Sequence, residues 1–148
     1  MQELNFPAYS FKYKNTQNKP YIFDVIRKGY YLLTPEEWVR QHMIRFLIEE
    51  KKYSPQLIAV EKQLEINGLK KRFDIVVFNK NMKPYILVEC KAPHIKIDQQ
   101  AFDQANRYNL LLKAPYLILT NGLKHLIFEI NFEARQYRFL SQIPPFKP

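Results

Sequence analysis

Two apolar segments near the middle of the chain, residues 72–78 and 85–91, constrain its fold most. Residues 79–84 between them are polar and include Asn, Lys and Pro, which are typical of turns. We therefore expect the two segments to form the strands of an antiparallel hairpin. The simplest register pairs Phe78 with Tyr85 across the turn.

This register brings charged side chains together at the open end of the hairpin. It places Asp74 opposite Glu89, with their Cβ atoms roughly 5 Å apart. Because side chains alternate along a strand, Glu89 and Lys91 share one face and Cys90 points to the other. Two carboxylates and an amine suit a hard divalent cation and an activated water. The alternative is a cross-strand ion cluster without chemistry, which contributes only ~0.2–1 kcal/mol when it is exposed.

A long helix is predicted upstream of this hairpin, over residues 35–52. Thr34 is its predicted N-cap, Pro35 takes the first helical position, and Thr34 with Glu37 fits a capping box. Capping is therefore an alternative to metal binding for Glu37.

A second helix is predicted downstream, from Asp98 as its N-cap to about Lys113. Gln104 and Tyr108 are four residues apart, so they lie on one side of this helix. That side suits contacts to a nucleic-acid backbone or to Lys91, and the alternative is a partly exposed helix face.

The remaining segments predict a mainly β chain around these two helices. Asn121-Gly122 is a strong hairpin signal between two apolar runs. The further predicted strands are residues 21–25, 30–33, 57–66, 116–120, 123–130 and 136–140.

Taken together, these residues resemble the N-terminal nuclease domain of type I restriction enzyme R subunits, in the PD-(D/E)XK nuclease superfamily. The resemblance implies an α/β fold with a restriction-endonuclease-like core, a mixed β-sheet flanked by helices. The segments that carry it occur in the order of the family: residues 33–41, 71–77, 88–93, 104–109 and 120–122.

The resemblance also implies the roles of the charged residues. Lys91 would act in catalysis with Asp74 and Glu89, by orienting or activating a water and steadying the transition state. The metal is expected to be Mg²⁺, with Mn²⁺ as a substitute. Its implied ligands are Asp74, Glu89 and one acid of the first helix, with Glu37 slightly preferred over Glu36. The Cys90 carbonyl is a further candidate ligand.

Four further residues are expected to support the site or contact nucleic acid. Gln104 and Tyr108 match a Gln-x-x-x-Tyr motif found beside such sites. Arg72 and His94 lie close to the site in sequence and are candidates for phosphate contacts.

The chain departs from the family at two points. Phe73 takes the place of the Pro that precedes the Asp in the superfamily motif. No G-x-x-x-x-G-K-[ST] phosphate loop occurs in the 148 residues, so we expect no ATP-driven translocation by this polypeptide itself.

The amino-acid composition predicts one domain, a polyanionic binding partner and a cytoplasmic location. The 148 residues fit a single domain, with residues 1–20 as a flexible arm that either packs or frays. A net charge of +9 favours polyanions such as DNA.

The single cysteine, Cys90, allows no internal disulfide and fits a cytoplasmic protein. No membrane span is expected. Other expected partners are motor or methyltransferase subunits and a second copy in a homodimer.

Three functions follow from these residues. The first is Mg²⁺-dependent hydrolysis of DNA phosphodiesters, in restriction or DNA processing. The alternative is a non-catalytic DNA-binding or assembly module that retains the nuclease fold. A metal-free structural protein with a surface ion cluster is the third.

Overall fold

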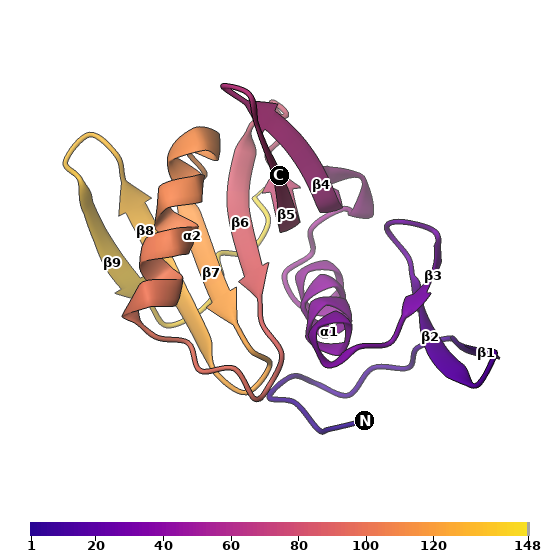
Figure 1. Cartoon of the computed structure of the whole chain (residues 1–148). Helices are drawn as coiled ribbons and strands as arrows, with labels where there is room; N and C mark the ends of the chain where they lie inside the picture. Colours follow the sequence, from indigo (N-terminus) through magenta and orange to yellow (C-terminus); the bar gives the residue numbers. More distant parts are fainter. Residues whose placement is uncertain (148) are drawn as a thin grey trace.

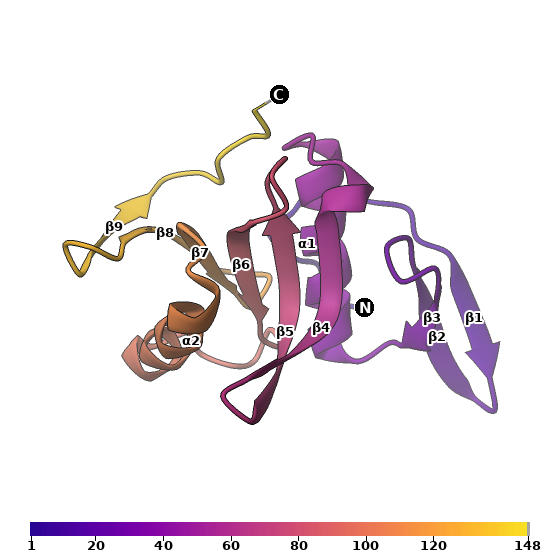
Figure 2. The same cartoon turned by 90° about the horizontal axis from the view of Figure 1, so that it is seen from above.

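In the computed structural model, which describes residues 1–147, helix α1 (Pro35–Glu49) lies between a large sheet and a small one (Figures 1 and 2). The strands of the large sheet are β4 (Ile58–Ile66), β5 (Leu69–Phe78), β6 (Pro84–Cys90), β7 (Tyr116–Thr120), β8 (His125–Asn131) and β9 (Gln136–Leu140). A short 3₁₀ helix, Pro55–Leu57, leads into β4.

The large sheet is mixed. Its strands run in the order β4-β5-β6-β7-β8-β9, and every neighbouring pair is antiparallel except β6 and β7. Parallel neighbours need a crossover connection, which is supplied here by helix α2 (Gln99–Leu112). The predicted α/β fold, a mixed sheet flanked by helices, is confirmed.

The two helices cover opposite faces of this sheet (Figure 2). Ile75 and Val88 pack toward α1 in one core cluster, whereas Val76 and Leu87 pack toward α2 in a second cluster. This is the period-two alternation of a sheet that is buried on both faces, and it explains why β5 and β6 are almost continuously apolar.

The small sheet lies on the far side of α1 from the large one (Figure 1). It consists of β1 (Tyr13–Thr16), β2 (Lys19–Asp24) and β3 (Gly29–Leu32), all antiparallel. The predicted hairpin over residues 21–33 corresponds to β2 and β3. Strand β1 was not predicted, because the polar Tyr-Lys-Asn-Thr segment lacks an apolar alternation.

The register of the β5–β6 hairpin is as predicted from Ile75 to Val77, and the ladder does not extend to Asp74 and Glu89, whose direct opposition stays a prediction. Ile75 pairs with Val88 and Val77 with Ile86, which is the predicted register. The pairing of Phe78 with Tyr85 is wrong, because Phe78 pairs with Pro84 and the register shifts there. Tyr85 is the extra residue, and its ring packs on that of Tyr116 with centroids 5.1 Å apart.

Side-chain caps begin both helices as predicted. The Thr34 side chain accepts a hydrogen bond from the Glu37 N–H at 3.0 Å, and Asp98 accepts from the Ala101 N–H at 2.9 Å. Helix α1 ends at Glu49, three residues earlier than predicted. A left-handed residue, Lys113, ends α2.

The first residues of the chain pack against α1 and the β7–β8 turn. Leu4 is buried, the Asn5 N–H donates to the Gly122 carbonyl, and the Gln2 carbonyl accepts from the Trp38 indole N–H. Of the two expectations for the N-terminal arm, the structure shows packing for this part. No helix within residues 1–147 is both long enough and apolar enough to cross a membrane.

The same region holds a buried histidine, for which we expect a pH effect. His42 is 6% exposed, and its Nδ1–H donates to the Trp38 carbonyl at 2.8 Å. Aromatic rings surround it, with centroids 4.4 Å away for Trp38 and 5.0 Å for Phe11. Burial lowers the pKa of His42, and the charge of Arg45 lowers it further.

Since the pKa of His42 is lower in the folded chain than in the unfolded one, acid should favour unfolding. This contribution to stability is present above the ordinary histidine pKa of about 6.5 and is lost as pH falls below it. Urea unfolding from pH 7.5 to 5.5 should therefore give a steeper loss of unfolding free energy in wild type than in His42→Phe or His42→Gln. Parallel curves would contradict the prediction.

Candidate functional site

A break in the strand alternation lies at Asp74. Phe73 packs toward α2 and Ile75 toward α1, although residues two apart in a regular strand face the same side. On the neighbouring strand Glu61 has a φ of 53°, and the ladder resumes on either side of it. The backbone of both strands is therefore irregular where the two acids lie.

The Asp74 carboxylate links β5 to β6 and to α1. Its Oδ2 accepts from the Cys90 backbone N–H at 3.0 Å, and its Oδ1 accepts from Arg40 Nη2 at 2.7 Å. A side chain here takes the place of a backbone ladder partner, which fixes Asp74 at the end of β6.

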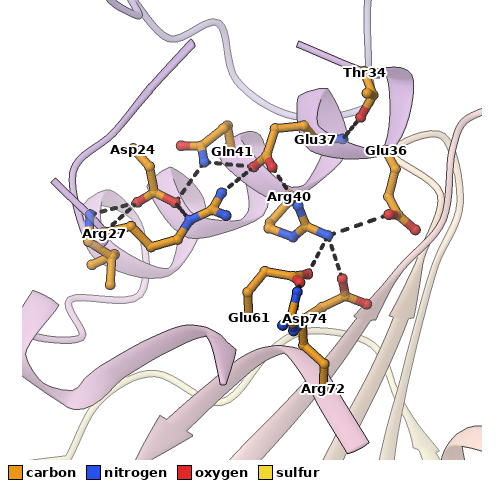
Figure 3. Close-up of polar contacts among 11 residues, drawn as sticks. Asp24, Arg27, Thr34, Glu36, Glu37, Arg40, Gln41, Glu61, Arg72 and Asp74 are labelled. Atoms are coloured by element: carbon orange, nitrogen blue, oxygen red, sulfur yellow. Dashed lines mark hydrogen bonds and ion pairs between the residues drawn. The ribbon is translucent and has the colours of Figure 1, made fainter. Parts of the chain in front are cut away.

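Arg40 is the centre of the acidic residues (Figure 3). Its Nη1 donates to Glu37 at 2.6 Å. Its Nη2 lies 2.7 Å from Asp74, 2.7 Å from Glu61 and 3.4 Å from Glu36. We call these five residues the Arg40 cluster. Although burial alone would lower the pKa of Arg40, the charges of Glu37 and Asp74 raise it.

Glu37 also connects the Arg40 cluster to the small sheet (Figure 3). Its second oxygen accepts from Arg27 at 2.8 Å and from Gln41 at 3.0 Å. Arg27 and Gln41 both also bind Asp24, which is fully buried at the end of β2. Both oxygens of Glu37 are thus occupied by donors, whereas Glu36 has one long contact and a side chain that is 47% exposed.

Glu89 lies on the α2 side of the sheet, whereas Arg40 reaches Asp74 from α1. Burial raises the pKa of Glu89 to about 8, with the negative charge of Asp74 as the second cause. Its Oε1 is buried and makes no hydrogen bond within the described part of the chain. A buried carboxylate oxygen without a partner is costly, so this atom is available for a cation.

Glu89 and Lys91 line a small pocket under α2, as predicted from their shared face. The cavity has a volume of about 50 Å³. Gln104 and Tyr108 also line it, so the structure brings these predicted residues together with Glu89 and Lys91. A second amine is Lys71, whose Nζ lies 4.3 Å from the centroid of the Tyr108 ring. We call this cavity the α2 pocket.

Three other predicted residues, Cys90, Arg72 and His94, lie around the site, and their contacts do not assign them a role. The Cys90 thiol is buried in the core on the α1 side, and burial raises its pKa far above the usual range. Arg72 is 62% exposed and lies 3.8 Å from Glu61. His94 is exposed in the loop that follows β6.

Sequence reasoning did not identify Arg40, Arg27, Asp24 or Gln41. One signal was present for part of the set, since Glu37, Arg40 and Gln41 are three and four residues apart on a helix. Their partners in β2, β4 and β5 are distant in the chain, so pairing could not be deduced.

The residues present fit Mg²⁺ as a two-carboxylate site. Mg²⁺ keeps several waters and needs only one or two protein carboxylates. Asp74 and Glu89 supply these. The unpartnered Glu89 oxygen is a free ligand atom, whereas an ion at Asp74 must compete with Arg40 and the Cys90 N–H, which occupy its two oxygens. Within residues 1–147 no group of three or more His, Cys, Asp or Glu side chains is arranged to hold a metal. The Arg40 guanidinium lies between the other acids instead.

The mixed sheet with a helix on each face is a restriction-endonuclease-like fold. Residues 35–144 match the family described as the type I restriction enzyme R protein N terminus, and the chain belongs to that family.

A solved structure shows the same fold. It is a fragment described as an HsdR subunit of a type I restriction enzyme from Vibrio vulnificus YJ016, with 21% sequence identity and a TM-score of 0.54. The match covers 76% of this chain and 24% of the other, so it spans about a quarter of the chain in that fragment structure. No curated protein matches the sequence.

Proposed function

We propose that this domain hydrolyses DNA phosphodiester bonds with Mg²⁺, or Mn²⁺ in its place. The observation that carries the proposal is the position of Glu89, a buried carboxylate with an unpartnered oxygen beside Asp74 and a pocket that contains two lysines. Membership of the restriction enzyme R protein family supports a nuclease role.

Asp74 and Glu89 would hold the metal, and the Cys90 carbonyl is a further proposed ligand. When bound, the ion would polarise the scissile phosphate and supply an activated water. Of the helix acids, the structure favours Glu36 over Glu37 for an outer contact, because Glu37 is held by Arg27 and Arg40.

Lys91 would provide the positive charge that the transition state requires. It lines the α2 pocket together with Glu89, so its ammonium can offset the charge that develops on a phosphate or position the attacking water. Lys71 is a second cation in this pocket, restrained by Tyr108. Gln104 and Tyr108 would bind the backbone of the substrate next to these lysines.

The partners follow from the same proposal. DNA is the proposed substrate, and a motor or methyltransferase subunit is the proposed assembly partner in the cytoplasm. Homodimerisation stays a prediction, as does the assignment of all 148 residues to one domain.

A second candidate is a non-catalytic DNA-binding or assembly module. It is favoured by Arg40, which binds Asp74 at 2.7 Å and neutralises the acid without a metal. In this case DNA binding would be indifferent to Mg²⁺ and to the loss of Asp74.

Cleavage of supercoiled and linear DNA should distinguish the two candidates. With Mg²⁺ or Mn²⁺ we expect nicked or linear products, and with EDTA none. Lys91→Ala should lower the rate by about 10²-fold or more, because it removes a charge next to the reacting phosphate. Lys80→Ala is the matched control, since Lys80 is exposed in the β5–β6 turn. A Lys91→Ala protein that cleaves like wild type would contradict the role of Lys91.

A further inference from the structure

The outward side of the small sheet carries lysines and aromatic rings in ordered rows. The pairing places Lys14 opposite Tyr21 and Phe23 opposite Tyr30. Since side chains alternate, the residues on the side away from α1 form one set. This outer face consists of Lys12, Lys14, Thr16, Lys19, Tyr21, Phe23, Tyr30 and Leu32.

Contacts between these side chains confirm that they share a face. Lys12 Nζ lies 5.7 Å from the Phe23 ring centroid, and Lys14 Nζ lies 5.5 Å from that of Tyr30. The rings of Phe23 and Tyr30 are 5.2 Å apart with an edge-to-face geometry. Tyr30 is 41% exposed and Leu32 is 43% exposed, so the face is open to solvent.

Within residues 11–33 no acidic side chain lies on this face to balance its lysines. Asp24 is the only acid between residues 11 and 33, and it is buried on the opposite side with Arg27 and Gln41. The face is therefore complementary to a polyanion.

The opposite side of the sheet is firmly attached to the domain. Ile22 and Asp24 are fully buried, and Asp24 connects through Arg27 to Glu37 of the Arg40 cluster. A sheet held so firmly, with its outer face unused by the domain, is suited to binding a ligand.

We propose that the outer face binds a single DNA strand, with the lysines on its phosphates and the exposed Tyr30 ring stacking on its bases. Single strands offer unpaired bases to aromatic side chains, whereas a duplex offers only its phosphates to such a surface. The inference rests on the proposed function in that it extends the binding path of the same DNA substrate beyond the metal site.

Fluorescence anisotropy with a labelled oligo(dT) strand in EDTA tests this without cleavage. The triple variant Lys12→Gln/Lys14→Gln/Lys19→Gln should weaken binding at least tenfold. It should also reduce the slope of log K against log salt by about 2, because three phosphate contacts are lost. The control Lys80→Gln/Lys83→Gln/Lys124→Gln removes the same charge from exposed lysines elsewhere and should change affinity less than twofold. Equal effects of both triples would overturn the proposal.

Stacking of bases on the Tyr30 ring is tested separately, by the affinity of Tyr30 variants for oligo(dT). Tyr30→Ala should weaken oligo(dT) binding roughly tenfold and leave duplex binding unchanged, whereas Tyr30→Phe should bind as wild type. An unchanged Tyr30→Ala affinity for oligo(dT) would overturn the assignment of a single strand.

The nuclease proposal and the outer-face proposal can fail independently, and experiments distinguish the two outcomes. An Asp74→Asn protein that neither binds metal nor cleaves should still bind oligo(dT), because the outer face does not include Asp74. If wild type cleaves DNA but the two triple lysine variants bind oligo(dT) equally well, the nuclease proposal stands. The proposal that the outer face binds DNA is then wrong.

Discussion

Replacing Asp74 by Asn, or Glu89 by Gln, should reduce metal-dependent cleavage on the order of a thousandfold or more. Each change keeps the size of the side chain and removes one of the two carboxylates that would hold Mg²⁺. Losing the ion removes both the polarised phosphate and the activated water, which together supply several kcal/mol of barrier lowering. Gel assays of plasmid cleavage with Mg²⁺, and calorimetric titration of Mn²⁺, measure the two effects separately.

The two variants should differ in their stability without metal. Asp74 binds Arg40 and the Cys90 N–H, so Asp74→Asn should unfold more easily. Burial raises the pKa of Glu89 to about 8, so the folded chain disfavours an ionisation that the unfolded chain allows. Glu89→Gln removes this cost and should be at least as stable as wild type. Urea unfolding in EDTA tests this contrast.

The matched control is Glu65→Gln. Glu65 is exposed on β4, away from the Arg40 cluster, and its substitution should change neither cleavage nor stability. Full cleavage by Glu89→Gln would contradict its assignment as a metal ligand, and full cleavage by Asp74→Asn would do the same for Asp74.

The hairpin that carries these acids could be predicted because local chemistry determines it. Apolar runs on either side of a polar turn fix the strand direction, and the register follows from the turn length. The error at Phe78 has a local cause in the turn itself. The Asn79 N–H bonds to the Lys83 carbonyl, and the Asn79 side chain accepts from the Lys83 N–H, which tightens the turn by one residue. Tyr85 is then left over as a bulge.

The centre of the acidic site could not be predicted in the same way. Arg40 binds Glu61 and Asp74, which lie 21 and 34 residues away along the chain. Such pairings depend on how α1 packs on the sheet, and a helix arginine in isolation reads as a solvent-exposed charge. The choice between Glu36 and Glu37 stays a prediction, and the contact of Glu37 with Arg27, in the turn between β2 and β3, could not be deduced for the same reason.

Replacing Arg40 by Gln should have the largest effect on stability, a loss of about 3–5 kcal/mol in EDTA. Arg40 is 5% exposed and faces four carboxylates, so its removal leaves several buried or half-buried negative charges without their counter-ion. Chemical unfolding of Arg40→Gln and wild type measures the difference. Arg40→Lys keeps the charge but not the forked geometry, and it should fall between them.

Metal should reverse part of this loss. In wild type the Arg40 Nη2 atom occupies Asp74 Oδ1, so a divalent ion must compete with it for that oxygen. Arg40→Gln frees the oxygen, and Mn²⁺ should therefore bind more tightly to the variant and raise its unfolding free energy more than that of wild type. The control is Arg138→Gln, because Arg138 pairs with Glu129 on the surface and is 72% exposed. Its loss should cost no more than about 1 kcal/mol and leave metal affinity unchanged. Weaker Mn²⁺ binding by Arg40→Gln than by wild type would show that Arg40 organises the site for the ion and does not compete with it.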